Sequence, residues 1–167
     1  PVLEEYAAFA RAAAGPEVLV VAPNVKATSV AELLALSKTQ DLNFASTGAG
    51  SMPHLAAELF KLKSGVKSQH VPHRGAAPAV NDLLGGQVQM AFFDLPILLP
   101  QVKAGKLKPI AIAAPERTPS AGDVPTTAEA GMPQLQAENW YGMIAPAKIP
   151  ADVLAVLNRA VVEAVKD

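Results

Sequence analysis

Short apolar runs alternate along this chain with segments in which apolar residues recur every three or four positions. The runs predict strands at 17–22, 88–94 and 107–114. A strand at 42–46 is predicted by alternation of Leu42, Phe44 and Ser46 with the residues between them, and a further strand is expected at 68–71. The periodic segments between them predict helices at 29–37, 51–62, 76–84 and 95–103. Strands that alternate with helices over short connections favour a parallel or mixed sheet covered by helices, so the expected fold class is α/β.

The two ends of the chain have a different character. The opening residues predict a helix from Leu3 to Ala14, and residues 115–125, rich in Pro and Gly, predict a loop or crossover. After this loop we expect a brief helix capped by Thr126 or Thr127 and ended by Gly131, a strand from Asn139 to Ala145 and an amphipathic helix that Pro150 opens. The expected organisation is a helix or crossover at 1–16, an α/β domain at 17–114, and a crossover loop, strand and helix at 115–167.

The turn between the strand at 42–46 and the next helix is the clearest candidate for a binding site. Gly48 and Gly50 allow close approach of the backbone or a positive φ. Ser51 is expected to cap the helix through its hydroxyl, and Pro53 falls in the first turn, where an N–H is not needed. The apolar residues that follow at helical spacing are Leu55, Leu59 and Leu62. Free amides and the positive end of the helix dipole then favour a carboxylate, phosphate or sulfate above the turn.

Phosphate cofactors fit this turn poorly. No Gly-Lys-Ser/Thr follows it, which excludes a Walker loop, and Gly48-Ala49-Gly50 lacks the third glycine of the dinucleotide fingerprint. The turn therefore favours a small carboxylate, and we expect no cofactor.

Composition narrows the function classes further. The chain has 167 residues, half of them hydrophobic, with 14 basic and 15 acidic side chains and a formal charge of −1. Without a basic excess or many aromatic residues it lacks the features of a nucleic-acid binder. It has no cysteine, and no apolar run reaches the roughly 20 residues of a membrane helix. Because it opens at Pro1 inside an expected helix, without a signal peptide, we expect a processed or truncated product.

Four ordered motifs resemble a known family. They are Asn43–Ser51 with His54-Leu55 and Glu58–Phe60, Val71–Ala79 with Asp82–Gly86, Asp123–Thr126 with Glu129–Gly131, and Trp140–Gly142 with Ala145-Pro146. Together they resemble the Bug family, the TctC-type extracytoplasmic solute receptors of tripartite tricarboxylate transporters. One departure is His73, where the family usually has Tyr. The resemblance covers nearly the whole chain.

The resemblance implies a periplasmic binding protein of the type II, Venus flytrap, fold. In that family two α/β lobes close over a small carboxylate or an amino acid, which backbone amides and ordered waters hold. This chain resembles the second lobe and the crossover strand and helix, without the first lobe. The ligand-binding residues implied in the second lobe are Ser46, Thr47, Gly48, Ala49, Gly50 and Ser51. The resemblance also implies a periplasmic location and membrane transporter subunits as partners.

A chain with one lobe of such a clamp is expected to behave differently from a complete receptor. It lacks the contacts that make closure favourable, so we expect weak or undetectable ligand binding by the chain alone. Exposed cleft surface is expected to favour self-association, including exchange of the Trp140 strand and the last helix between copies.

Three other residues are candidates for the site, each with an alternative role. Asp94 ends a strand, where ligands collect in open α/β sheets, but it is also placed to cap the next helix. His54 lies one turn into its helix and is expected to brace the loop more than to touch a ligand. Arg74 has the chemistry to pair with a carboxylate, yet an arginine in a turn is more often a solvated surface group. Trp140 and Tyr141 are expected to pack between lobes.

An enzyme is the weaker alternative. Ser51, His54 and Asp94 resemble a triad in composition only, because a serine three residues before a histidine at one helix start is poorly placed to reach the far ring nitrogen. There is also no Gly-x-Ser-x-Gly elbow, so we expect no catalytic residues. His70 and His73 lack a spaced carboxylate or a third ligand, so we expect no metal site.

A second alternative is the ligand-sensing effector domain of a LysR-type transcriptional regulator, which uses a similar two-lobe fold. The feature that separates it from a receptor is an N-terminal helix-turn-helix with basic side chains.

Overall fold

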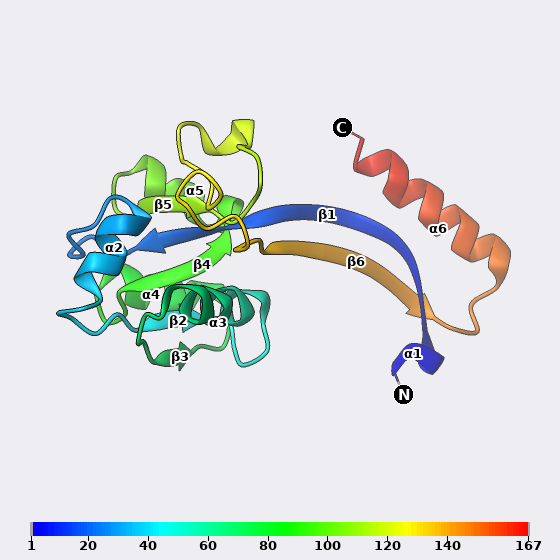
Figure 1. Ribbon diagram of the computed structural model, residues 1–167. Coiled ribbons are helices and arrows are strands. Elements are labelled where there is room, and N and C mark those ends of the chain that lie inside the picture. Colours follow the sequence, from blue (N-terminus) through cyan, green and yellow to red (C-terminus); the bar gives the residue numbers. More distant parts are fainter. Residues whose placement is uncertain (1, 167) are drawn as a thin grey trace. The chain divides into compact units, whose positions relative to one another are not determined.

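A computed structural model describes residues 2–166 of the chain (Figure 1), which separate into two units. One unit runs from Pro16 to Glu138, and the other combines the residues up to Gly15 with those from Asn139 onward. The larger unit extends past the expected boundary at Ala114 because the following segment stays bound to the sheet. Backbone bonds join Thr127 N to Ile112 O at 2.8 Å and Ala137 N to Ala113 O at 3.0 Å.

The larger unit is built on a mixed sheet with the strand order β3-β2-β4-β1-β5. The strands are β1 (Tyr6–Val21), β2 (Phe44–Ser46), β3 (His70–Pro72), β4 (Met90–Asp94) and β5 (Lys108–Ile112). β2 runs parallel to β3 and β4, whereas β1 runs antiparallel to β4 and β5. The predicted α/β class, a mixed sheet flanked by helices, is confirmed.

The central strands are apolar rather than alternating, apart from Glu17 and Asp94 at their paired ends. All residues of β4, and the part of β1 from Glu17 to Val21, are buried. Continuous burial is typical of strands covered on both faces. Pro109, expected at an edge or an entry position, lies in the edge strand β5, where its missing N–H is harmless.

The predicted helices of this unit form with bounds close to those expected. They are α2 (Val30–Leu36), α3 (Met52–Ser64), α4 (Ala76–Leu84) and α5 (Leu95–Lys103). Ser29 caps α2 by accepting from Glu32 N at 3.2 Å. The Glu32 carboxylate accepts in return from Thr28 N at 2.8 Å, one residue further back than the usual capping box.

The buried face of α3 differs from the leucine stripe that its spacing suggests. Leu55 and Leu62 are 51% and 78% exposed, and Leu59 packs at the border of the core. The buried residues are Pro53, Ala56, Ala57 and Phe60. The small alanines let the helix backbone come close to β2 and β4, and Phe60 fills the remaining core volume.

The structure differs most from the sequence prediction in the smaller unit. The predicted helix from Leu3 to Ala14 is wrong: α1 covers only Val2–Glu5, and β1 begins at Tyr6. β1 pairs with β6 (Glu138–Pro146), which supplies the backbone partners that an alanine-rich segment otherwise finds in a helix. The strand and the last helix predicted at the C-terminal end are confirmed as β6 and α6 (Ala151–Ala164).

The brief helix predicted after Thr126 is also wrong, because residues 127–131 form turns. The capping contacts nevertheless exist: Thr126 N donates to Glu129 Oε2 at 2.8 Å, and Glu129 N donates to Thr126 Oγ1 at 3.1 Å. Thr126 pairs with Ile112 in a parallel bridge, and Met132 N returns to Thr127 O at 2.8 Å. These long-range bonds hold the segment in a single turn. A short 3-10 turn, η1 (Pro119–Ala121), precedes it.

Among residues 2–166, no helix combines the length and the apolar character that crossing a bilayer requires.

Candidate functional site

The sheet topology brings the candidate residues to the edge of the sheet at which β2, β3 and β4 have their carboxyl ends. β2, β3 and β4 are parallel, so the loops after their carboxyl ends lie at the same edge. Each loop leads into a helix: β2 into α3, β3 into α4 and β4 into α5. This edge therefore carries three helix N-termini, the positive ends of their dipoles. Open α/β sheets collect ligands at such an edge.

The side chains of the turn from Ser46 to Ser51 hold the turn itself. Ser46 Oγ accepts from Gly48 N at 3.0 Å and lies 3.1 Å from Gly48 O. Ser51 Oγ donates to Gly48 O at 2.7 Å, and Ser51 N donates to the same oxygen at 3.2 Å. Gly48 and Gly50 have φ values of 130° and 80°, so glycine is needed at both positions.

The expected capping bond of Ser51 is wrong. Ser51 occupies the N-cap position of α3, but its side chain makes no capping hydrogen bond. Two features account for this. Pro53 removes the N2 amide, one of the two usual donors to an N-cap oxygen, and the hydroxyl proton is already committed to Gly48 O.

Several amides of the turn remain available because the serines bond to Gly48. Among the residues that the structure describes, the N–H groups of Thr47, Ala49, Met52 and His54 have no hydrogen-bond partner. Ala49 and Gly50 are exposed, and Thr47 is half-buried. Unpaired amides at a helix start are the groups that hold anions in other proteins.

His54 braces the turn from inside α3, as expected from the sequence. Its Nδ1 accepts from Gly50 N at 3.0 Å, which places any ring proton of the neutral form on Nε2. Nε2 lies 3.9 Å from Glu58 Oε1. This arrangement also removes the triad alternative, because the near ring nitrogen binds a backbone amide and the Ser51 hydroxyl donates elsewhere.

His70 is a second brace, and sequence reasoning missed it. Its ring stacks on His54 with centroids 4.0 Å apart and on Phe44 at 5.0 Å. Its Nε2 lies 2.5 Å from Ser46 Oγ. Burial, and next the charge of His54, lower the pKa of His70 below its ordinary value. The signal that could have found it is the register of β3 on β2, where His70 faces Phe44.

The loop after β3 is tied to the same turn. His73 N donates to Ser46 O at 3.0 Å, and the His73 ring contacts Val71 O at 3.0 Å and Asp82 Oδ2 at 2.8 Å. His73 therefore has a carboxylate neighbour that the sequence reading did not expect. Within the described part of the chain, no group of three or more metal-ligating side chains comes together.

Arg74 follows β3 and Asp94 ends β4, the two strands that flank β2. Arg74 is exposed, and among residues 2–166 it makes no hydrogen bond or ion pair. Asp94 sits at the N-cap of α5 and is 9% exposed, but its carboxylate makes no capping bond to that helix.

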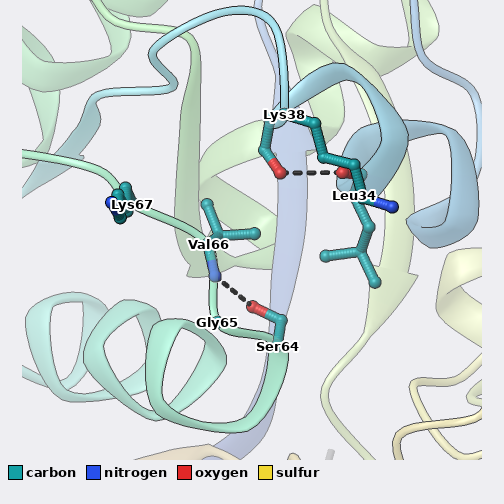
Figure 2. Close-up of a pocket in the computed structure, with 7 residues that line it drawn as sticks. Leu34, Lys38, Ser64, Gly65, Val66 and Lys67 are labelled. Carbon is teal, nitrogen blue, oxygen red and sulfur yellow. Dashed lines mark hydrogen bonds between the residues drawn. The ribbon is translucent and has the colours of Figure 1, made fainter.

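A pocket lies at the other end of α3 (Figure 2) and is separate from this site. It has a volume of about 560 Å³, and its lining residues are Leu34, Ser37, Lys38, Ser64, Gly65, Val66 and Lys67. Its hydroxyls are already bonded: Ser37 Oγ to Leu34 O at 2.8 Å and Ser64 Oγ to Phe60 O at 2.6 Å. α3 has 13 residues, so this pocket and the turn are about 20 Å apart.

Comparison with known proteins decides between the alternatives. Residues 3–167 match the family described as tripartite tricarboxylate transporter family receptor, TctC. The chain belongs to this family. Protein BugT of Bordetella pertussis is 35% identical over 99% of this chain and 51% of its own length. The family match favours the receptor over the LysR-type effector domain.

Solved structures of TctC and Bug proteins have the same fold. Rpa4515 of R. palustris, solved with adipate, superposes with a TM-score of 0.93 at 32% identity, over 96% of this chain and 55% of that one. MatC from Rhodopseudomonas palustris, solved with malate, gives 0.89 at 32% identity, over 95% and 55%. The lysine-, arginine- and histidine-binding protein ArtJ of Geobacillus stearothermophilus, at 17% identity, shares the fold alone. The chain spans about half the length of the curated relatives that it matches.

Proposed function

We propose that this TctC-family chain supplies the second-lobe half of a solute site that captures a small carboxylate or an amino acid. The observation that carries the proposal is the set of unpaired amides in the turn after β2, at Thr47, Ala49 and Met52. They stand at the positive end of α3, where a carboxylate gains both hydrogen bonds and dipole stabilisation. The proposed ligand-binding residues are Ser46, Thr47, Gly48, Ala49, Gly50, Ser51 and Asp94, with His54 and Arg74 as outer contacts.

Backbone recognition explains why the side chains give little specificity here. The hydroxyls of Ser46 and Ser51 are bonded to Gly48 within the turn. Their role in the proposed site is to orient amides, and water then fills the gaps between those amides and the solute. Malate and adipate, found with MatC and Rpa4515, are the ligand class that such a site accepts.

The proposal includes the setting of the whole receptor. The protein acts in the periplasm, delivers its solute to the membrane subunits of a tripartite transporter, and catalyses no reaction. The chain alone binds weakly, because it supplies one side of the clamp. Copies associate through exposed apolar side chains of β6 and α6, among them Trp140 at 63% and Val156 at 64% exposure.

Ligand-observed saturation-transfer NMR tests the proposal, because it detects millimolar affinity. The chain is mixed separately with malate, adipate, a monocarboxylate and several amino acids. We expect transfer to at least one carboxylate. Transfer to none of them contradicts the proposal, and so does hydrolysis of simple esters that disappears in Ser51→Ala.

A further inference from the structure

Glu17 is a buried carboxyl group that the proposed site does not use. It opens the buried part of β1 and is 0% exposed. Among the residues that the structure describes, neither of its carboxyl oxygens has a hydrogen-bond partner. Burying an ionised carboxylate without hydrogen bonds is costly, so such a group is expected to keep a proton instead.

The charged neighbour of Glu17 is Asp94. The two residues are directly opposite each other in the antiparallel pairing of β1 with β4. Residues opposite each other in such a pair point to the same face, with Cβ atoms about 5 Å apart, and like charges there are unfavourable. The other segments bonded to Glu17 present Ala113 and Ala137, which carry no charge.

Both features act on the same proton equilibrium. Burial, followed by the negative charge of Asp94, raises the pKa of Glu17 from its ordinary value of 4.5 to about 8. Asp94 is itself only 9% exposed and lies beside Glu17 on the neighbouring strand.

We propose that Glu17 is a proton-holding positioning residue of this site, whose neutral carboxyl allows Asp94 to keep its place at the sheet edge. Ionisation of Glu17 places a second negative charge beside Asp94 and destabilises the unit from Pro16 to Glu138. The same charge repels an anionic solute at the turn after β2. The part of the inference that concerns solute binding rests on the proposed function, whereas the part that concerns the proton does not.

The sign of the pH dependence follows from the raised pKa of Glu17. Between pH 4.5 and about 8 the folded chain holds the Glu17 proton and the unfolded chain has released it. The stabilisation is complete below pH 4.5 and is lost as the pH rises towards 8. Above pH 8 the residue is ionised in both states, and its contribution no longer changes.

The test compares thermal unfolding of the chain and of two Glu→Gln variants from pH 5 to pH 9. Glu17→Gln carries an uncharged group of the same shape, and Glu116→Gln is the matched control on an exposed carboxylate. We expect the midpoint of the original chain to fall by several degrees between pH 5 and 8. Glu116→Gln should keep this fall and Glu17→Gln should lose most of it. An equal fall in Glu17→Gln overturns the inference.

If Glu17→Gln does not fold, direct titration of Glu17 in the original chain tests the inference instead. The carboxyl carbon of Glu17 is followed by NMR in the original chain. A midpoint near pH 8 supports the inference, and a midpoint near 4.5 overturns it.

Malate titration distinguishes a failure of the Glu17 inference from a failure of the proposed function. Malate is titrated at pH 6 and pH 9 into the original chain and Glu17→Gln. We expect binding to weaken several-fold at pH 9 only in the original chain. Equal weakening in both overturns the solute part of the inference. Absence of binding at either pH contradicts the proposed function, while the unfolding result still decides whether Glu17 holds a proton.

Discussion

The two ends of α3 have similar sequences and opposite chemistry. Each end combines serines with a glycine at positive φ: Gly50 at 80° before the helix and Gly65 at 74° after it. At the start, the serines bond to a carbonyl and leave amides unpaired. At the end, Gly65 N returns to Lys61 O and Val66 N donates to Ser64 Oγ, so the amides there are used. Helix polarity therefore decides which end of α3 suits an anion.

A negative charge placed at one end of α3 or at the other should give the largest difference in malate affinity. Ala49→Asp puts a carboxylate beside the unpaired amides, where it competes with the solute and repels it. We expect malate affinity to fall by roughly tenfold or more, equivalent to about 1.4 kcal/mol. The matched control is Leu62→Asp in the last turn of α3, at a side chain that is 78% exposed. It should change the affinity less than twofold. Equal losses in both variants would place the solute elsewhere.

Glycine replacement should separate stability from binding. Gly50→Ala and Gly65→Ala each force an alanine into positive φ without a steric neighbour within 4 Å. We expect both to lower the free energy of unfolding by roughly 1–2 kcal/mol in urea denaturation. Only Gly50→Ala should also weaken binding of malate, because it alone distorts the turn. Weaker malate binding by Gly65→Ala would contradict the assignment of the solute site to the start of α3.

A smaller effect is expected from the serines. Ser46→Ala leaves the half-buried ring of His70 and the amide of Gly48 without their shared partner. We expect a loss of about 1–3 kcal/mol in the free energy of unfolding. Ser64→Ala removes a bond to Phe60 O at 2.6 Å and a long bond from Val66 N at 3.3 Å. Because Ser64 is half-buried whereas Ser46 is fully buried, this loss should cost less. The reverse order in chemical denaturation would show that the Ser46 network does not hold the turn.

The smallest predicted effect is a pH response of the same network. Because the pKa of His70 is lowered in the folded chain, the unfolded chain binds the proton more readily below pH 6.5. The contribution of His70 is thus present above pH 6.5 and is lost as the pH falls through the lowered value. NMR titration of the His70 ring should give a midpoint below 6.5. A midpoint at or above 6.5 would contradict partial burial of His70 in its stack with His54 and Phe44.

The larger unit could be predicted from sequence because local preference and tertiary role agree there. The buried runs at β1 and β4 are apolar except for Glu17 and Asp94, and Gly65 and Gly85 stand where their helices end. The residues before Gly15 show the opposite case. Their alanines favour a helix, and only pairing with β6, more than a hundred positions away, makes them a strand.

The position of the candidate site in the chain could be predicted from the sequence, but its hydrogen-bond network could not. The glycines and Pro53 located the turn, and the bracing role of His54 followed from its place one turn into the helix. The hydrogen bond of Ser51 to Gly48 depends on a backbone path that spacing does not encode. His70 joins the network only through strand register, and Glu17 meets Asp94 only because β1 lies antiparallel beside β4.

Amide chemical-shift mapping tests whether the turn after β2 binds the solute. The isotope-labelled chain is titrated with malate, and the shift of every backbone amide is followed by NMR. We expect the largest changes at Thr47, Ala49 and Met52, with little change from Ser64 to Lys67. Changes that cluster at Ser64 to Lys67, or no change at saturating malate, would contradict it.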